Sequence, residues 1–305
     1  MTTTPKTQPQ KPAQKMKPKI LLLTQMHQRP AISELFCLSA LRLQEASRKN
    51  FDVTIVSLVS DAPSEAVCRK HSIDMIFTCA GPLGKKMNTG ITLLLKNYQF
   101  DYLLKIDDDD IVSSNLLEIY TPFIKKGVPL FGVKQVYFLD AANNQAVYYK
   151  YPYTVAKLMG CGKMISRIAL ERTGWQSTIK PKNNYRHLGV QFYADRHVTI
   201  PHYQAHYMVE MKYADMVSIP KFNLFNDEQT MGLDFVSEMN FVFNGYDPVE
   251  VVTEKPLFTD VKTNVNIWKF ADYANVGKQV PVSEATSHWS IQEREYLLQL
   301  QAQLK

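Results

Sequence analysis

Short apolar segments alternate with amphipathic segments through the first third of the chain. The apolar segments have the length of buried strands, and the amphipathic ones have helical spacing of their apolar positions. The strand-like segments are 20–23, 51–58, 73–78 and 101–106, and the helix-like segments are 31–47, 64–71 and 87–98. This alternation predicts an α/β fold, with parallel βαβ units in a doubly wound mixed sheet flanked by helices. Right-handed crossovers bring the carboxyl ends of such strands to one edge. The loops expected at that edge lie around Gln25, around Ser60, at 82–87 and around Asp107.

The pattern changes after residue 110. The elements predicted there are a helix at 116–126, strands at 129–139 and 146–153 joined by a turn at 140–144, a strand at 158–165, a helix at 167–172 ended by Gly174, a helix at 233–244 closed by Gly245 and a strand at 250–253. Residues 176–226 are aromatic, rich in histidine and irregular. Ser290-Ile-Gln-Glu293 is a capping box, which predicts a last amphipathic helix to about residue 304.

Four consecutive aspartates, Asp107 to Asp110, follow the apolar segment that ends at Ile106. Four carboxylates at the end of a strand repel one another, and leaving them unpaired is costly. A hard divalent cation is the simplest compensation, because it takes oxygen ligands and often holds a substrate phosphate as well. Ligands of open α/β sheets bind just outside the carboxyl ends of the strands, which fits this position. The alternative is a solvated acidic turn that caps a helix beginning near Ser114.

Composition and charge add limits to this picture. Hydrophobic residues make up 45% of the chain and charged residues 21%, which is ordinary for a soluble globular protein. No apolar run approaches the roughly 20 residues that span a bilayer, so a cytoplasmic location is expected, in the host cytoplasm if the protein is viral. The four cysteines are widely spaced, which favours buried free thiols over a zinc site or disulfides.

The net charge of +6 comes mostly from one end of the chain. Residues 1–19 carry five lysines and no acid, which leaves 30 basic and 29 acidic residues for the rest. The Thr-, Pro- and Gln-rich tail at 1–18 is expected to be disordered. It is either a solubilising leader or a weak electrostatic tether to nucleic acid or anionic lipid.

Three segments, in this order, resemble the family 2 group of GT-A fold glycosyltransferases, over most of residues 19–246. Ile20–Pro30 resembles the first strand and nucleotide-facing loop, Pro82–Gly90 resembles a basic-residue-then-Asn-x-Gly segment, and Leu104–Asp110 matches the Asp-x-Asp metal motif. The resemblance implies a Rossmann-like nucleotide half at 19–110 and an acceptor half at 111–289, which together form the catalytic domain, followed by a C-terminal helix at 290–305. It also implies transfer of a sugar from a nucleoside diphosphate donor, UDP-linked, to a hydroxyl acceptor. Mn²⁺ or Mg²⁺ would neutralise the diphosphate leaving group.

The resemblance also implies roles for individual residues. Those expected to contact the donor are Thr24, Arg29, Asp61, Lys86, Asn88, Asp107 and Asp108. Asp61 occupies the place that contacts the uracil ring, and Lys86 would reach phosphate or sugar. Asp107 and Asp109 are the expected metal residues, with His288 as a further ligand just before the last helix. The register stays open, because Asp108 and Asp110 also form an Asp-x-Asp pair.

The general base has candidates from two alignments. Residues 226–232 resemble the Glu-Asp segment of family 2 enzymes and also a Glu-Asp element of family 31 galactosyltransferases, which selects Asp227 or Glu228, the preferred choice. Aligning residues 243–246 with the end of the family 2 helix selects Asp234 instead. An inverting enzyme needs one such carboxylate to deprotonate the acceptor hydroxyl. Gly160 and Gly162 resemble an acceptor-side segment in which glycines let the backbone approach the donor sugar, or they mark a bulge or bend.

Two acceptor classes remain open for such an enzyme. One is a saccharide or lipid-linked glycan, and the other is a hydroxymethylated base in DNA, as in phage DNA modification. The basic tail and the lysine- and aromatic-bearing stretch 180–213 allow the second, whereas the near-neutral body argues against extensive phosphate contact.

Two other classes of protein share this pattern. A nucleotidyltransferase would have a glycine-rich loop after its first strand, and 24–30 contains no glycine. A non-catalytic α/β module that binds a metal or nucleotide is the remaining alternative.

Overall fold

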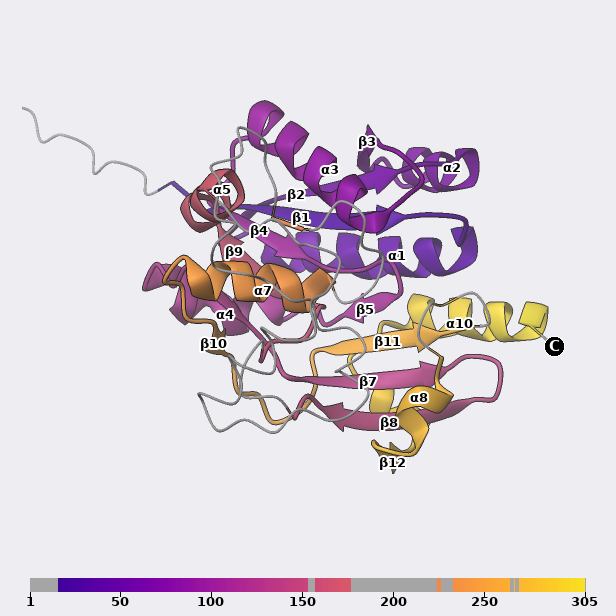
Figure 1. Ribbon diagram of the computed structural model, residues 1–305. Coiled ribbons are helices and arrows are strands. Elements are labelled where there is room, and N and C mark those ends of the chain that lie inside the picture. The colour runs from indigo at the N-terminus through magenta and orange to yellow at the C-terminus, as the bar shows by residue number, and fades with distance from the viewer. Residues whose placement is uncertain are drawn as a thin grey trace, which may run out of the picture.

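The strands form two mixed sheets flanked by helices in a computed structural model that describes residues 16–152, 157–176, 224–225, 233–263, 266 and 269–304 (Figure 1). The first sheet has seven strands among these residues. Their order is β10 (Val249–Glu250), β6 (Leu130–Gly132), β9 (Lys163–Ser166), β4 (Tyr102–Lys105), β1 (Lys19–Met26), β2 (Asp52–Val59) and β3 (Asp74–Phe77). β4, β1, β2 and β3 are parallel, and β9 is antiparallel to β4 and β6. The predicted α/β fold with a helix-flanked mixed sheet is therefore confirmed.

Helices cover both faces of this first sheet. One face packs on α1 (Pro30–Ser47), α2 (Ala62–Lys70) and α4 (Leu116–Lys125), and the other on α3 (Leu83–Asn97), α5 (Arg167–Gln176) and α7 (Leu233–Phe243). Successive residues of β1 alternate between the two cores: Ile20 and Leu22 lie in the first, Leu21 and Leu23 in the second. This double burial explains why β1 is a continuous apolar run rather than an alternating one.

A second sheet, with five strands within the described residues, lies beside the first (Figure 1). Its order is β12 (Lys278–Val280), β8 (Gln145–Lys150), β7 (Gln135–Asp140), β11 (Phe258–Lys262) and β5 (Asp110–Val112). The strand predicted at 129–139 is two strands, because β6 joins the first sheet and β7 joins the second. The apolar run continues across the change of sheet, so hydrophobic periodicity gives no sign of it.

The last helix is held by the predicted capping box. In α10 (Ile291–Leu304) the Ser290 amide donates to Glu293 Oε2 at 2.6 Å, and the Glu293 amide donates to Ser290 Oγ at 3.2 Å. Arg42 Nε of α1 donates to Glu293 Oε1 at 2.8 Å, which ties α10 to the first layer. Two short helices, α8 (Ala271–Ala274) and α9 (Val282–Ala285), precede it. Within the described residues, none of the helices has the length and apolar character that crossing a membrane requires.

Several predicted boundaries differ from the structure. The helix expected to stop at Gly174 continues to Gln176, since glycine inside a helix costs only about 1 kcal/mol, which tertiary packing can offset. The strand predicted at 158–165 begins at Lys163, because Gly162 has a φ of 74° that a strand cannot adopt. The strand predicted at 146–153 ends at Lys150. The disordered tail predicted at 1–18 and the irregular region predicted at 176–226 lie largely outside the described residues.

Candidate functional site

The loops after β1, β2 and β4 meet at one edge of the first sheet, as the sequence predicts. Gln25 Nε2 donates to Asp107 Oδ1 at 3.0 Å, joining the loop after β1 to the aspartate run. Arg29, at the start of α1, donates from its guanidinium to Asp109 Oδ2 at 3.0 Å and also contacts Asp108. The ends of parallel strands therefore bring groups about eighty residues apart into direct contact.

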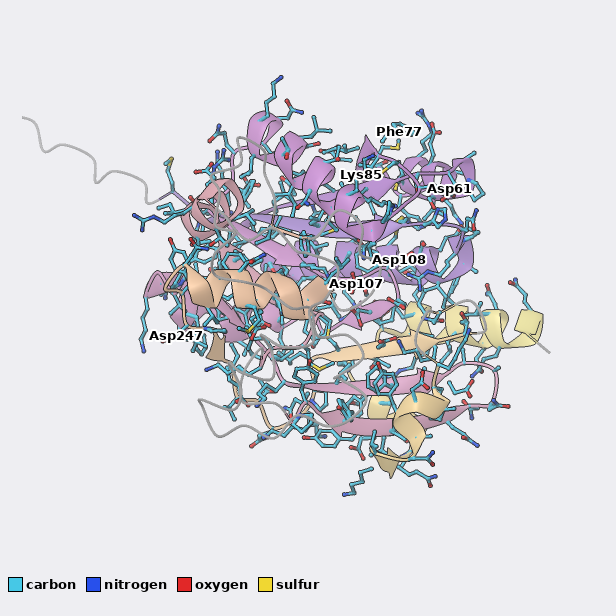
Figure 2. The ribbon with its side chains drawn as sticks, viewed as in Figure 1. Asp61, Phe77, Lys85, Asp107, Asp108 and Asp247 are labelled. Atoms are coloured by element: carbon cyan, nitrogen blue, oxygen red, sulfur yellow. The ribbon has the colours of Figure 1, made fainter. Side chains whose placement is uncertain are left out.

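The four consecutive aspartates lie in three different environments. They form a tight turn, in which the Asp110 amide donates to the Asp107 carbonyl at 3.1 Å, and Figure 2 labels Asp107 and Asp108 in this turn. Asp107 Oδ1 and Oδ2 accept from Lys105 Nζ at 3.0 and 3.1 Å. Asp108 is wholly buried, where Oδ2 accepts from Ser33 Oγ at 2.6 Å and Oδ1 from Arg29. The protein itself thus satisfies Asp108.

Asp109 and Asp110 join Asp260 of β11 in a cluster of carboxylates whose candidate ligand oxygens all lie within 4.8 Å of one another. Asp110 and Asp260 face each other directly across the antiparallel β5–β11 pair, where like charges are destabilising. Asp260 Oδ2 accepts from Lys262 Nζ at 2.7 Å, while its buried Oδ1 has no hydrogen-bond partner among the described residues. Asp110 forms no ion pair within that part of the chain. The cluster therefore holds more negative charge than its surroundings balance.

Two neighbours orient Asp109 within the cluster. Asn266 Nδ2 donates to Asp109 Oδ2 at 2.6 Å, and Arg29 donates to the same oxygen. The Asn266 side chain is itself fixed, because its Oδ1 accepts from the Thr263 amide at 2.6 Å. Asp109 is thus held from both the loop after β1 and the segment after β11.

The pKa values of these carboxyl groups report the same imbalance. Burial raises the pKa of Asp110 well above its usual range, and the charges of Asp260 and Asp109 raise it further. Burial also raises the pKa of Asp260 to about 7, against the attraction of Lys262. The pKa of Asp109 falls, because the charges of Arg29 and Lys262 outweigh its burial. Burial raises the pKa of Asp108 to about 6, although Arg29 opposes the rise. A cation placed among these groups would lower the cost of ionising Asp110 and Asp260.

Asp61 lies at the same edge, after β2, and caps α2. Its Oδ1 accepts from the Ser64 amide at 2.9 Å, and its Oδ2 accepts from the Gln28 amide at 3.0 Å. His27 Nδ1 lies 2.9 Å from Asp61 Oδ2. Burial alone would raise the pKa of Asp61, but these hydrogen bonds lower it. The structure therefore gives Asp61 a capping role beside the donor role predicted for it.

Thr24, Lys86 and Asn88 are buried below this edge. Lys86 Nζ donates to the Met26 carbonyl at 2.9 Å and to Ser60 Oγ at 3.1 Å, and burial lowers its pKa to about 8. Asn88 donates to the Phe225 carbonyl at 2.7 Å and accepts from the Phe225 amide at 3.0 Å. Thr24 Oγ1 is buried and has no partner in the described part of the chain. Their donor contacts stay predictions, and the contacts seen for Lys86 and Asn88 are structural.

Asp234, in the first turn of α7, lies next to the aspartate run. Its Oδ1 is 3.2 Å from Lys105 Nζ, and its side chain is 35% exposed. Gly160 leaves the space that this carboxylate fills, because a Cβ built there would lie 2.4 Å from Asp234 Oδ2. The pKa of Asp234 is lowered, since the charges of Lys105 and Lys163 outweigh burial. Asp227 and Glu228, the preferred base candidates, lie outside the described residues.

His288 is not part of the carboxylate cluster. Its Nε2 donates to the Ile111 carbonyl at 3.2 Å, and its buried Nδ1 has no partner among the residues described. Burial lowers the pKa of His288 to about 4, and the charges of Arg42 and Arg294 lower it further. The ring is therefore neutral, and it supports the strand that carries Asp110. The ligand role predicted for it gains nothing from these contacts.

Sequence reasoning did not select Asp260, Lys262 or Asn266. One signal was present: Asp260 and Lys262 are charged residues at the end of the apolar run that begins at Leu257. Charges in a buried strand pattern break local consistency, which usually has a functional reason. The pairing of β11 with β5 then brings Asp260 opposite Asp110, and a single sequence does not reveal that pairing.

Comparisons with known proteins give structural likenesses only. No family model and no curated protein matches the chain. The structure of TarS 1–349 from S. aureus is similar at 13% identity and a TM-score of 0.43, over 80% of this chain and 60% of that one. The mannosyltransferase PcManGT from Pyrobaculum calidifontis, in complex with GDP-Man and Mn²⁺, is similar at 10% identity and a TM-score of 0.44, over 95% of this chain and 77% of that one.

Glucosyl-3-phosphoglycerate synthase from Mycobacterium tuberculosis, in complex with Mn²⁺, UDP and glucosyl-3-phosphoglycerate, is similar at 13% identity and a TM-score of 0.36, over 52% of this chain and 59% of that one. The chain thus spans about 60% of the lengths of the TarS 1–349 and synthase structures. Likenesses at TM-scores below 0.5 do not assign an activity, so the function proposed for this chain rests on the residues of its own site.

Proposed function

We propose that this protein is a metal-dependent GT-A type glycosyltransferase, which moves a sugar from a nucleoside diphosphate donor, UDP-linked, to a hydroxyl acceptor. The observation that carries the proposal is the under-compensated cluster of Asp109, Asp110 and Asp260. It lies where the loops after β1 and β4 meet, with Asp61 in the loop after the neighbouring strand β2. A cation site next to the carboxyl ends of parallel strands is suited to a nucleoside diphosphate.

The residues of the cluster fit a divalent cation. All three offer carboxylate oxygens, the donor set that Mn²⁺ and Mg²⁺ prefer. The buried Oδ1 of Asp260 lacks a partner among the described residues, and it belongs to a side chain whose other oxygen is held by Lys262. When bound, the cation supplies neutralisation of the charge that develops on a diphosphate leaving group. Asp109, Asp110 and Asp260 are the residues that would hold it.

Other residues of the chain bind and orient the substrates. Asp61, with His27 beside it, would accept hydrogen bonds from the base of the nucleotide. Asp107 faces Lys105 and is partly exposed, which suits contact with ribose or sugar hydroxyls. Asp234 would take the proton from the acceptor hydroxyl, as an inverting mechanism requires. Its ionised form is favoured by Lys105 and Lys163, and because its Oδ1 is buried, Oδ2 of this 35% exposed side chain is the oxygen that would take the proton. Asp227 and Glu228 remain the competing candidates for this role.

Release of UDP is the direct test of this activity. The protein is incubated with UDP-sugars and Mn²⁺, and free UDP is measured with and without a chelator. Chelator-sensitive release that Asp109→Ala abolishes supports the proposal. Release of pyrophosphate from a nucleoside triphosphate and a sugar phosphate would instead indicate a nucleotidyltransferase. Metal-dependent binding without any turnover would indicate a non-catalytic module.

The acceptor class needs a separate experiment, because glycans and hydroxymethylated DNA both present a hydroxyl. Binding to hydroxymethylated duplex DNA is measured at increasing salt concentration. A steep decrease in affinity with salt, together with sugar transfer to the duplex, supports the DNA acceptor. Salt-independent transfer to a saccharide supports the glycan acceptor.

A further inference from the structure

Two buried lysines lie side by side below α7, and each forms an ion pair with one carboxylate of that helix. Lys105 of β4 and Lys163 of β9 are register partners in the antiparallel pair of these strands. Lys105 pairs with Asp234 at 3.2 Å, and Lys163 pairs with Glu238, one helical turn later, at 3.0 Å. Each lysine therefore attaches the helix to the sheet through one carboxylate.

The surroundings of the two pairs differ in one respect. Glu238 is completely buried, and both its oxygens also lie 3.3 Å from the Leu158 amide that donates to them. Asp234 is 35% exposed, and Lys105 also contacts the 27% exposed Asp107 in the turn after β4. The Lys163 pair therefore lies in the protein interior, whereas the Lys105 pair lies next to the aspartate run of the site.

The backbone and the side chain of Asp234 are held by different groups. Lys163 Nζ donates to the Asp234 carbonyl at 2.9 Å, which fixes the start of α7. The carboxylate itself has Lys105 as its ion-pair partner and lies against Gly160, where no side chain blocks it. Lys105 Nζ contacts both carboxylates, lying 3.0 Å from Asp107 Oδ1 and 3.2 Å from Asp234 Oδ1, and carboxylates that share one such neighbour repel each other when its charge is removed.

We infer that Lys105 is a positioning residue that couples the donor side of the site to the acceptor side. Its ammonium group holds Asp107, proposed to contact ribose or sugar, and Asp234, proposed to take the acceptor proton, in one arrangement. The inference rests on the proposed function and deepens it, since it assigns the orientation of the base to a residue that touches neither substrate. Displacement of a catalytic group by about 1 Å can cost roughly 100-fold in rate, so this role is measurable.

The test compares Lys105→Met with Lys163→Met, two changes that keep side-chain volume and remove one buried charge each. The probes are UDP and UDP-glucose with Mn²⁺, with the Kd of UDP and the rate of UDP release as readouts. We expect Lys105→Met to lower the rate roughly 100-fold. The fold-change in the Kd of UDP should be at least tenfold smaller than the fold-change in the rate. Lys163→Met should lower the melting temperature, and it should reduce the rate at least tenfold less than Lys105→Met does, because Lys163 contacts the Asp234 carbonyl rather than its carboxylate.

A double-mutant cycle separates positioning from a general loss of structure. In an Asp234→Asn background, Lys105→Met should lower the rate by less than about threefold further, because both changes remove the same function. Losses that multiply would overturn the inference, as would equal losses in Lys105→Met and Lys163→Met. If the methionine variants do not fold, Lys105→Arg and Lys163→Arg keep the charge but move it, and the same inequality in rate is expected. A wild type that neither binds UDP nor releases it overturns the proposed function as well, and this control shows which of the two has failed.

Discussion

The carboxyl edge of the first sheet and the facing edge of the second contribute to the site in different ways. At the first edge the protein pairs its own polar groups: Asp61 caps a helix, Asp108 is bound by Ser33 and Arg29, and Lys86 binds a carbonyl. At the second edge Asp110 and Asp260 face each other with Lys262 as their nearby cation. Polar groups that already have hydrogen-bond partners favour a ligand that fits their shape. Charged groups without a counter-charge instead favour a ligand of the opposite charge.

This difference separates two kinds of binding within one site. The first edge is suited to an organic ligand, such as the base and ribose of a nucleotide. The second edge is suited to a cation, and α7 adds a carboxylate from a third direction. A different substitution therefore tests the first edge, the second edge and α7, and each has its own expected result.

The largest effect is expected at Asp234 of α7. Asp234→Asn should lower the rate of sugar transfer about 1,000-fold, within the range that loss of a general base produces. Donor affinity should change little, because Asp234 faces Lys105 and Gly160 rather than the nucleotide edge. Steady-state kinetics measure the rate, and Asp227→Asn and Glu228→Gln are the matched variants. A greater loss in either of these would move the base to the segment 226–232.

The second edge is tested by Asp260→Asn. We expect the affinity for Mn²⁺ to fall about 100-fold, as removal of an oxygen ligand from a small cation site should produce. In the absence of metal, the same change should lower the free energy of unfolding, because it leaves the buried Lys262 without its carboxylate partner. Calorimetry and chemical denaturation measure the two quantities. Asp272→Asn, on exposed α8, is the control and should alter neither. An affinity for Mn²⁺ that Asp260→Asn leaves unchanged would contradict the metal site described for this edge.

The first edge is tested by the pH dependence of stability at Lys86. Burial lowers the pKa of Lys86 to about 8 in the folded protein, from an ordinary value of 10.5. Between these values the unfolded chain binds more protons than the folded one, so stability increases with pH in this window. The free energy of unfolding of the wild type should therefore rise by about 2 kcal/mol relative to Lys86→Met between roughly pH 7 and 10. Denaturation at several pH values measures it, and parallel curves would show that Lys86 is not held as described.

The smallest effect is expected at Asp61. Asparagine is as good an N-cap as aspartate, so Asp61→Asn keeps the cap of α2 and removes only the charge. We expect UDP to bind about tenfold more weakly, the equivalent of one charge-assisted hydrogen bond, with the melting temperature close to that of the wild type. Titration calorimetry measures the affinity. Glu65→Gln, on the same helix, should leave it unchanged, and an equal loss there would assign the effect to the helix instead.

The same two regions differ in how far the sequence predicts them. The loops after β1, β2 and β4 could be placed together because alternating strands and helices fix the order of the parallel strands. Gln25 and Asp107 consequently meet as expected. The aspartate run was visible as a break in an apolar pattern.

The second edge depends on pairings between segments far apart in the chain. Asp110 and Asp260 are 150 residues apart and become neighbours only through the β5–β11 pair. Two features hid this pairing: β5 has only three residues, and the run that contains β6 and β7 gives no sign of the change of sheet. The sequence likewise predicts Lys105 only as part of a buried strand, because its two carboxylate partners come from separate elements.

Binding of UDP with and without Mn²⁺ tests most directly the claim that this edge is a metal and nucleotide site. Thermal denaturation of the wild type and of Asp109→Ala is followed with UDP alone, Mn²⁺ alone and both together. The melting temperature of the wild type should rise several degrees with both ligands and much less with either one, and Asp109→Ala should lose the joint increase. A wild type whose melting temperature does not respond to UDP and Mn²⁺ at millimolar concentration would contradict the account and leave the aspartate run as an acidic turn.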